Sequence, residues 1–171
     1  MTPELCRAFA RYNRMMNDRL YTVASTLTQE ERTRDLGAFF KSVHGTLNHL
    51  LLADRVWLRR FEGLAPPAGI RALDQELFAD FEELRRERAA TDAELTVWVE
   101  PLSAEQLAAP LRYARGGTIC EEPLWWSVSH LFNHQTHHRG QLTTLLMQLG
   151  RDPGATDFIA MLRAESTQQR S

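Results

Sequence analysis

The chain has 171 residues, of which 43% are hydrophobic and 25% are charged, and its formal net charge is −2. This length and composition are typical of one globular domain whose core needs neither disulfides nor metal ions for stability, so we expect a single domain over residues 1–171. The near-neutral charge provides no basic surface for nucleic acid, which excludes that class of partner.

The cysteines and the N-terminal segment indicate the cellular compartment of the protein. The two cysteines, Cys6 and Cys120, form no close pairing motif, which argues against a disulfide-stapled fold and against a cysteine-built zinc site. The N-terminal segment MTPELCRAFARYNRMMNDRL carries charges throughout and reads neither as a signal peptide nor as a membrane span. We therefore expect a soluble cytoplasmic protein with no membrane partner.

The first part of the chain has the periodicity of two long helices. In residues 3–27, apolar side chains recur at spacings of three and four, which predicts an amphipathic helix. Thr28 and Glu31 then match the pattern of a capping box over a short turn. We place the second helix at about residues 36–61, where Gly63 and the prolines of LAPPAG end it.

A third long helix follows, at about residues 73–99, and Pro101 ends it. Ser103 and Gln106 match a second capping box, which opens a short helix that Pro110 closes. This segment therefore contributes one long helix and one short one.

The stretch LRYARGGTICEEPLWW is strand-like, and its RGG sequence predicts the turn of a small β-hairpin. The fourth long helix follows Pro123 and ends at about Leu149, before GRDPG. The tail ATDFIAMLRAE predicts a last short helix that packs back on the others. Together these elements predict an all-α four-helix bundle with a small β-hairpin inserted before the last long helix.

Four of the six histidines lie in HLFNHQTHHRGQ, residues 130–141. A helix turns about 100° per residue, so His130, His134 and His138 form one row, with His137 on its flank. His130 and His138 are about 12 Å apart along the helix axis, which is too far for one ion to bind both. An ion can bind either adjacent pair in the i, i+4 geometry of helical zinc motifs, while hydrogen-bonding histidines without metal fit the spacing equally well.

A third metal ligand has to come from another helix. The remaining histidines, His44 and His49, both lie in the predicted second helix, five residues apart, or about 140° around its axis. Only one of them is expected to face the bundle core. The helix is apolar nearly all round, so its periodicity does not decide which one.

Two stretches, HGTLNHLLLADRVWLRRFEG and HLFNHQTHHRGQLTTLLMQLG, closely resemble the DinB-like (damage-inducible) family of the DinB/YfiT metalloenzyme superfamily. The opening YNRMMNDRLY and the closing LGRDPGATDFIAML are also similar to that family, so the resemblance covers nearly the whole chain. It implies a four-helix bundle in up-down-down-up order, often a homodimer, with a divalent metal ion held by three histidines.

Carried over by position, this resemblance implies that the metal ligands are His49, in LNHLL, and His134 with His138, in NHQTHHRGQ. It leaves three histidines without a ligand role: His44, His130 and His137. Of these, His130 and His137 are expected to line the pocket around the metal ion.

Three histidine ligands leave coordination positions open, which is typical of a catalytic ion, and zinc or nickel suits such a site best. Such an ion can support either hydrolysis or thiol transfer. Related families are similar to thiol S-transferases that use a low-molecular-weight thiol cosubstrate. We therefore expect an enzyme that acts on a small molecule in one of these ways. The alternative is a non-catalytic stress-response protein whose metal stabilises the bundle or senses a ligand.

The sequence identifies no catalytic residue. Asn17, Tyr21 and Gln141 are candidates for polar groups of the pocket, and each is explained equally well as an interface or surface residue. Arg139 is expected to form a structural ion pair.

Overall fold

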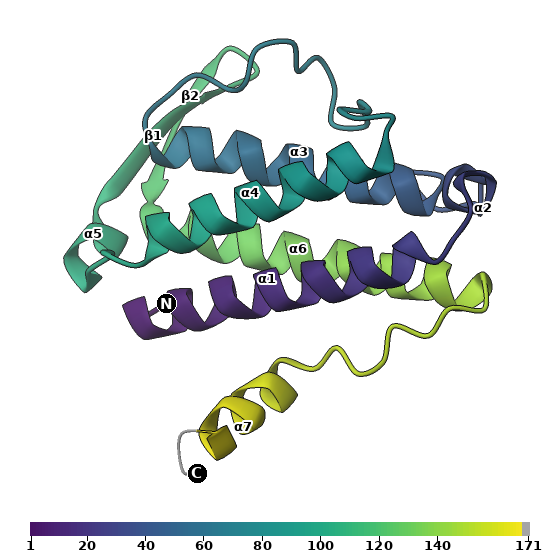
Figure 1. Cartoon of the computed structure of the whole chain (residues 1–171). Coiled ribbons are helices and arrows are strands. Elements are labelled where there is room, and N and C mark those ends of the chain that lie inside the picture. Colours follow the sequence, from purple (N-terminus) through teal and green to yellow (C-terminus); the bar gives the residue numbers. More distant parts are fainter. Residues whose placement is uncertain (169–171) are drawn as a thin grey trace.

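The computed structural model describes residues 1–168 and contains four long helices: α1 (Pro3–Ser25), α3 (Val43–Phe61), α4 (Phe81–Val99) and α6 (Leu124–Gln148). Figure 1 shows α1 and α6 running in one direction and α3 and α4 in the other. This is the predicted four-helix bundle in up-down-down-up order. The parallel helices α3 and α4 are joined by a crossover segment, residues 62–80, which passes over the outside of the bundle (Figure 1).

The shorter elements are α2 (Gln29–Thr33), α5 (Ala104–Ala108), α7 (Phe158–Gln168), β1 (Pro110–Arg115) and β2 (Thr118–Pro123). The two strands form the predicted antiparallel hairpin, and its turn is made by Gly116 and Gly117, whose φ angles are 56° and 81°. Both predicted capping boxes are confirmed, at the N-termini of α2 and α5. No helix within residues 1–168 is long and apolar enough to cross a membrane.

Helix α3 begins at Val43, seven residues later than the predicted start at residue 36. Residues 36–41 form a tight turn instead, in which Lys41 has a φ of 65° and its carbonyl accepts a hydrogen bond from the Leu36 N–H at 2.8 Å. Ser42 then caps α3 by accepting a hydrogen bond from the Gly45 N–H at 3.0 Å. The apolar pattern continues through the turn, which is why periodicity alone placed the start wrongly.

Helix α4 begins at Phe81, eight residues after the predicted start at residue 73. The backbone before it is held by a side chain of α3: Asn48 Oδ1 accepts hydrogen bonds from the N–H groups of Leu77, at 2.8 Å, and Phe78, at 3.0 Å. Asp80 caps the helix through the Glu83 N–H at 2.7 Å. Tertiary hydrogen bonds to Asn48 therefore replace the helical ones that the sequence pattern predicted.

Two leucine-rich clusters form the core of the bundle, one toward each end. The first contains Leu20, Leu50 and Leu146, and the second contains Leu95 and Leu131, all at most 1% exposed. Complete burial of such a side chain contributes about 1.5–3 kcal/mol, so these clusters are a major source of stability for the bundle.

A buried ionic network lies among the four long helices. Arg88 of α4 pairs with Asp54 of α3 at 2.8 Å and with Asp92 at 3.0 Å, and all three side chains are less than 5% exposed. Burial raises the pKa of Asp54, and the Arg88 cation opposes that rise. Asn17 of α1 donates to Asp92 at 3.0 Å, and Gln135 of α6 donates to Asp54 at 2.5 Å. Each long helix therefore contributes to one hydrogen-bonded group.

Arg139 of α6 lies beside this network and is buried. It donates hydrogen bonds to the amide oxygens of Asn13 and Gln135, and its guanidinium lies 5.0 Å from the centre of the Tyr12 ring. Among the described residues no carboxylate lies within ion-pair distance of it, so the predicted ion pair is wrong. Amide groups satisfy this cation instead.

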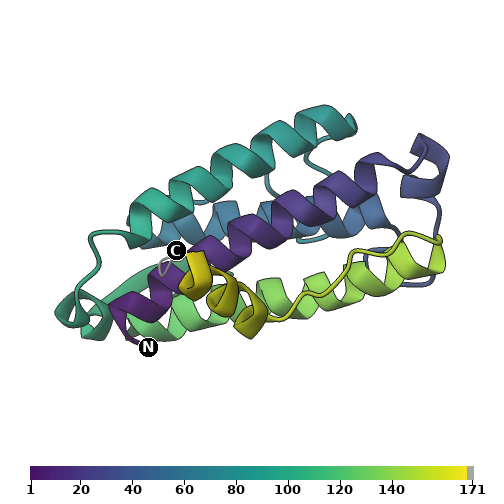
Figure 2. The same cartoon turned by 60° about the horizontal axis from the view of Figure 1, so that its bottom comes forward.

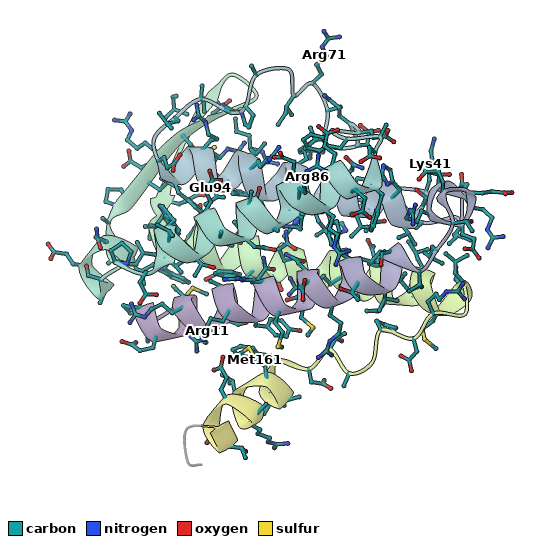
Figure 3. The ribbon with its side chains drawn as sticks, in the orientation of Figure 1. Arg11, Lys41, Arg71, Arg86, Glu94 and Met161 are labelled. Carbon is teal, nitrogen blue, oxygen red and sulfur yellow. The ribbon has the colours of Figure 1, made fainter. Side chains whose placement is uncertain are left out.

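The C-terminal helix α7 packs back on α1, as predicted (Figure 2). Met161, labelled in Figure 3 between the two helices, is buried in a cluster with Tyr12 and Met16. At the same face Arg11 pairs with Glu165 at 3.0 Å.

The ionic network yields a first prediction. Replacing Arg88 with alanine leaves the carboxylates of Asp54 and Asp92 buried without a cation, so we expect the free energy of unfolding to fall by about 3 kcal/mol or more. Arg86→Ala, on the exposed face of the same helix, should change it by less than about 0.5 kcal/mol. Chemical denaturation measures both, and equal effects of the two substitutions would contradict the role of the network.

Candidate metal site

Three histidines from two neighbouring helices meet in the bundle. His49 projects from α3, and His134 and His138 project from successive turns of α6. The nitrogens that can bind an ion all lie within 4.8 Å of one another, and Nε2 of His49 is 3.1 Å from Nε2 of His134. The structure therefore brings together the three histidines that the resemblance selects, from positions up to 89 residues apart in the chain (138 − 49).

Hydrogen bonds on the opposite ring nitrogens orient two of these imidazoles. Nδ1 of His49 lies 2.8 Å from the carbonyl oxygen of Leu73, in the crossover segment, and Nδ1 of His138 lies 2.8 Å from Oε1 of Gln141. An oxygen acceptor requires the proton on Nδ1, so Nε2 keeps its lone pair in both rings. Partners of this kind normally fix the ligand tautomer at metal sites.

The donor set fits a divalent ion. Two imidazole nitrogens bound at about 2.0–2.1 Å to a tetrahedral zinc ion lie roughly 3.3 Å apart, close to the 3.1 Å that separates His49 and His134. Burial lowers the pKa of His49 and of His138. It lowers the pKa of His134 to about 3, with smaller contributions from the neighbouring imidazoles. All three rings are therefore in the neutral form that binds metals.

Phe40 covers one side of the cluster, and sequence reasoning missed it. Its ring stacks on that of His49, with 3.7 Å between the ring centroids and an interplanar angle of 16°. The tight turn before α3 places this ring against His49. The turn brings the Phe40 carbonyl oxygen so close to residue 45 that a Cβ there would lie 2.3 Å from it, so only glycine allows the approach. The glycine after the histidine of VHGTL was the available signal.

The other histidines lie outside the cluster. His44 is buried, and its Nε2 lies 2.9 Å from the Phe78 carbonyl oxygen of the crossover segment. His137 lies on the exposed flank of α6. His130 lies one turn before His134, with 5.8 Å between the two ring centroids, and lines the adjoining cavity.

Of the polar residues proposed for the pocket, only Gln141 contacts a histidine of the cluster. Asn17 belongs to the ionic network, and Tyr21 is buried in the core beside Phe81, with 5.9 Å between ring centroids. Both are core residues of the α1–α4 side of the bundle.

A cavity of about 560 Å³ adjoins His49 and His134. It lies between α3 and α6 and reaches the β-hairpin. Its larger side chains are Trp57, Arg60, Tyr113, Arg115, Glu122 and Trp126. Trp126 is 54% exposed, so this lining residue is not part of the core. The histidine cluster is thus accessible to a small molecule.

Comparison with known proteins identifies the family. The family model described as "DinB family" matches residues 1–171. The chain belongs to the DinB family. It is 25% identical over 153 residues to Protein DinB of Bacillus subtilis (strain 168), a match that covers 86% of this chain and 87% of the relative.

Two further relatives are more distant. Over 158 residues the chain is 23% identical to the uncharacterized protein YizA of the same organism, covering 88% of this chain and 92% of YizA. The crystal structure of a DinB-like protein from Bacillus cereus ATCC 10987 superposes with a TM-score of 0.62 at 18% identity, covering 82% of this chain and 89% of that one. The latter similarity concerns the fold. Family membership together with the histidine cluster is compatible with a metal-binding protein.

The contact between Gln141 and His138 yields a second prediction. In Gln141→Leu the His138 ring loses its Nδ1 partner, so we expect zinc affinity to fall about 10- to 100-fold. Gln148→Leu changes an exposed glutamine on the same helix and should leave the affinity unchanged. Competition with a chromophoric chelator measures both affinities, and an unaltered affinity in Gln141→Leu would show that the hydrogen bond has no influence.

The low pKa of His134 yields a third prediction. Between pH 6.5, its ordinary pKa, and about 3, the unfolded chain binds a proton at this ring and the folded chain does not. The free energy of unfolding of the metal-free protein should therefore fall as the pH decreases through this window. In His134→Gln the fall should be shallower, whereas His137→Gln should keep the full slope. Urea titrations at pH 7, 5.5 and 4 compare the slopes, and identical slopes would contradict the shift.

Proposed function

We propose that this protein is a metal-dependent enzyme in which His49, His134 and His138 bind one divalent ion, zinc or nickel. The observation that supports it best is the convergence of three neutral imidazoles, with two tautomers fixed, beside a cavity of about 560 Å³. Three protein ligands leave at least one coordination position for a substrate or water, as catalytic zinc sites do.

We propose that the reaction is a hydrolysis or a thiol transfer on a small molecule. When bound, the ion supplies Lewis acidity, lowers the pKa of water or stabilises a thiolate. Neither of the two cysteines lines the cavity, and Cys6 is completely buried with its thiol pKa raised by burial to about 11. A reacting thiol would therefore belong to a low-molecular-weight cosubstrate, which the open cavity can admit.

The residues around the cluster have positioning roles in this proposal. The Leu73 carbonyl and Gln141 hold two imidazoles with Nε2 free, and Phe40 covers one face of the His49 ring. The leucine clusters form without any contribution from the site, so the bundle does not need the ion for its core. This favours a catalytic ion over a structural one, because removal of a structural ion normally unfolds a small domain.

Single substitutions provide the fourth prediction. His49→Ala, His134→Ala and His138→Ala should each lose the one ion per chain that the wild type binds, as measured by elemental analysis. His130→Ala and His137→Ala serve as controls and should keep it. Because the core is independent of the site, chelator-treated wild type should stay helical and unfold cooperatively, as followed by circular dichroism.

The cobalt- or nickel-substituted protein distinguishes the two roles of the ion further. Added imidazole or a small thiol should change its visible spectrum, since an open position accepts a further ligand. Unfolding on metal removal, or a spectrum insensitive to every added ligand, would favour the non-catalytic alternative.

A further inference from the structure

Two arginines line the cavity away from the histidine cluster, on the side of His130, whose pKa is lowered by burial and also by their charges. Arg60, near the end of α3, and Arg115, at the end of β1, both line it. Among residues 1–168 no carboxylate lies within ion-pair distance of either guanidinium. Paired surface arginines such as Arg112, which lies 3.0 Å from Glu121 in the same hairpin, show that the chain supplies such partners elsewhere.

Within the described part of the chain one carboxylate lines the cavity, and it has other partners. Glu122 Oε1 accepts hydrogen bonds from the Tyr113 hydroxyl, at 2.7 Å, and from the Ser127 hydroxyl, at 2.8 Å. Burial raises the pKa of Tyr113 to about 12, so this phenol stays protonated and continues to donate. Glu122 is therefore engaged by hydroxyl groups: its charge acts on Arg60 through space and opposes the lowering of that group's pKa by burial, but within residues 1–168 it forms no ion pair with either arginine.

The Arg60 side chain is held in place by aromatic rings. Its guanidinium carbon lies 4.6 Å from the centre of the Trp57 ring and 4.8 Å from that of Tyr113, and its Nε is buried without a hydrogen-bond partner. Burial lowers the pKa of Arg60, and Arg115 contributes in the same direction. Among residues 1–168 no hydrogen bond from the Nη groups of Arg60 is found, and a partly desolvated, preorganised guanidinium with free Nη donors favours binding of a planar oxyanion.

The charges and the shape of the cavity restrict the ligand further. Apart from imidazoles, the charged side chains lining it are Arg60, Arg115 and Glu122, so two positive charges and one negative charge leave a net +1. A ligand with one negative charge neutralises this net charge, whereas a ligand with two negative charges would leave the cavity with a net charge of −1. Between His49 and Arg60, which are roughly 16 Å apart along α3, the wall is formed by Ala53 and Val56.

We propose that the substrate of this site is an elongated monocarboxylate. Its carboxylate binds Arg60 and Arg115, and its apolar middle lies against Ala53 and Val56. Its reactive group then lies at the histidine cluster. This assignment rests on the function proposed above for the positioning of the reactive end, whereas the carboxylate end depends on the arginines alone.

Binding of 4-phenylbutyrate and of its neutral amide, 4-phenylbutyramide, to the zinc-loaded protein tests the assignment by calorimetry. The acid should bind at least about tenfold more tightly than the amide, because it forms charge-assisted hydrogen bonds. Arg60→Gln should remove this preference without changing the affinity for the amide. Arg59→Gln is the matched control: Arg59 is the preceding residue on α3, donates to the Ala65 carbonyl and does not line the cavity, so its substitution should keep the preference.

The metal-free protein separates this inference from the proposed function. The preference for the acid should persist after chelation and in His134→Ala. If the preference for the acid disappears when the metal is removed but survives in zinc-loaded Arg60→Gln, the carboxylate is a metal ligand and the assignment is overturned. Equal or absent binding of the two probes by the wild type would overturn it as well. A wild type that binds no zinc but retains an Arg60-dependent preference would refute the metal-dependent function and leave the anion site in place.

Discussion

The pairing of Arg88 with Asp54 and Asp92 is the constraint on which the arrangement of the bundle depends. A buried cation with two buried carboxylates tolerates little displacement, because moving one partner away leaves the other charges uncompensated in a low-dielectric interior. Gln135 connects this group to α6, since its amide donates both to Asp54 and to the carbonyl of Leu50, at 3.2 Å. Leu50 follows His49 and Gln135 follows His134 in the chain. The ionic network therefore sets the register of α3 against α6 that brings the two imidazoles together.

The histidine cluster combines two opposing effects of burial. Loss of solvent makes protonated imidazoles unfavourable, which keeps the rings neutral and their lone pairs free. The same loss of solvent makes any unpartnered ring nitrogen costly, and this cost is reduced by Leu73 for His49 and by Gln141 for His138. Nε2 of His134 lies 3.1 Å from Nε2 of His49, at hydrogen-bond distance. The three neutral rings are therefore a group that could hold a metal ion.

The sequence predicted the long helices, the hairpin and the histidine cluster because each rests on local spacing or on a distinctive motif. It misplaced the starts of α3 and α4, where a turn at Lys41 and hydrogen bonds to Asn48 replace helical ones. For Phe40 the sequence offers only the indirect signal of Gly45, which permits the turn but does not name the ring that the turn places. The Leu73 carbonyl has no signal at all, because a backbone oxygen acts through tertiary position, which no residue type encodes. The ligand roles and the homodimer stay predictions, since an ion and a second chain decide them.

The contact between His49 and the crossover segment uses a main-chain oxygen, and this has an evolutionary consequence. Leu73 itself is 61% exposed, so almost any residue there presents the same carbonyl to the imidazole. Arg71 points outward nearby (Figure 3), which leaves the middle of the segment similarly free to change its composition. What must be conserved is the number of residues between this carbonyl and the Asn48 anchor at Leu77 and Phe78. Residues 73–78 should therefore accept point substitutions during divergence, as exposed loops do, but resist the insertions and deletions that such loops usually tolerate.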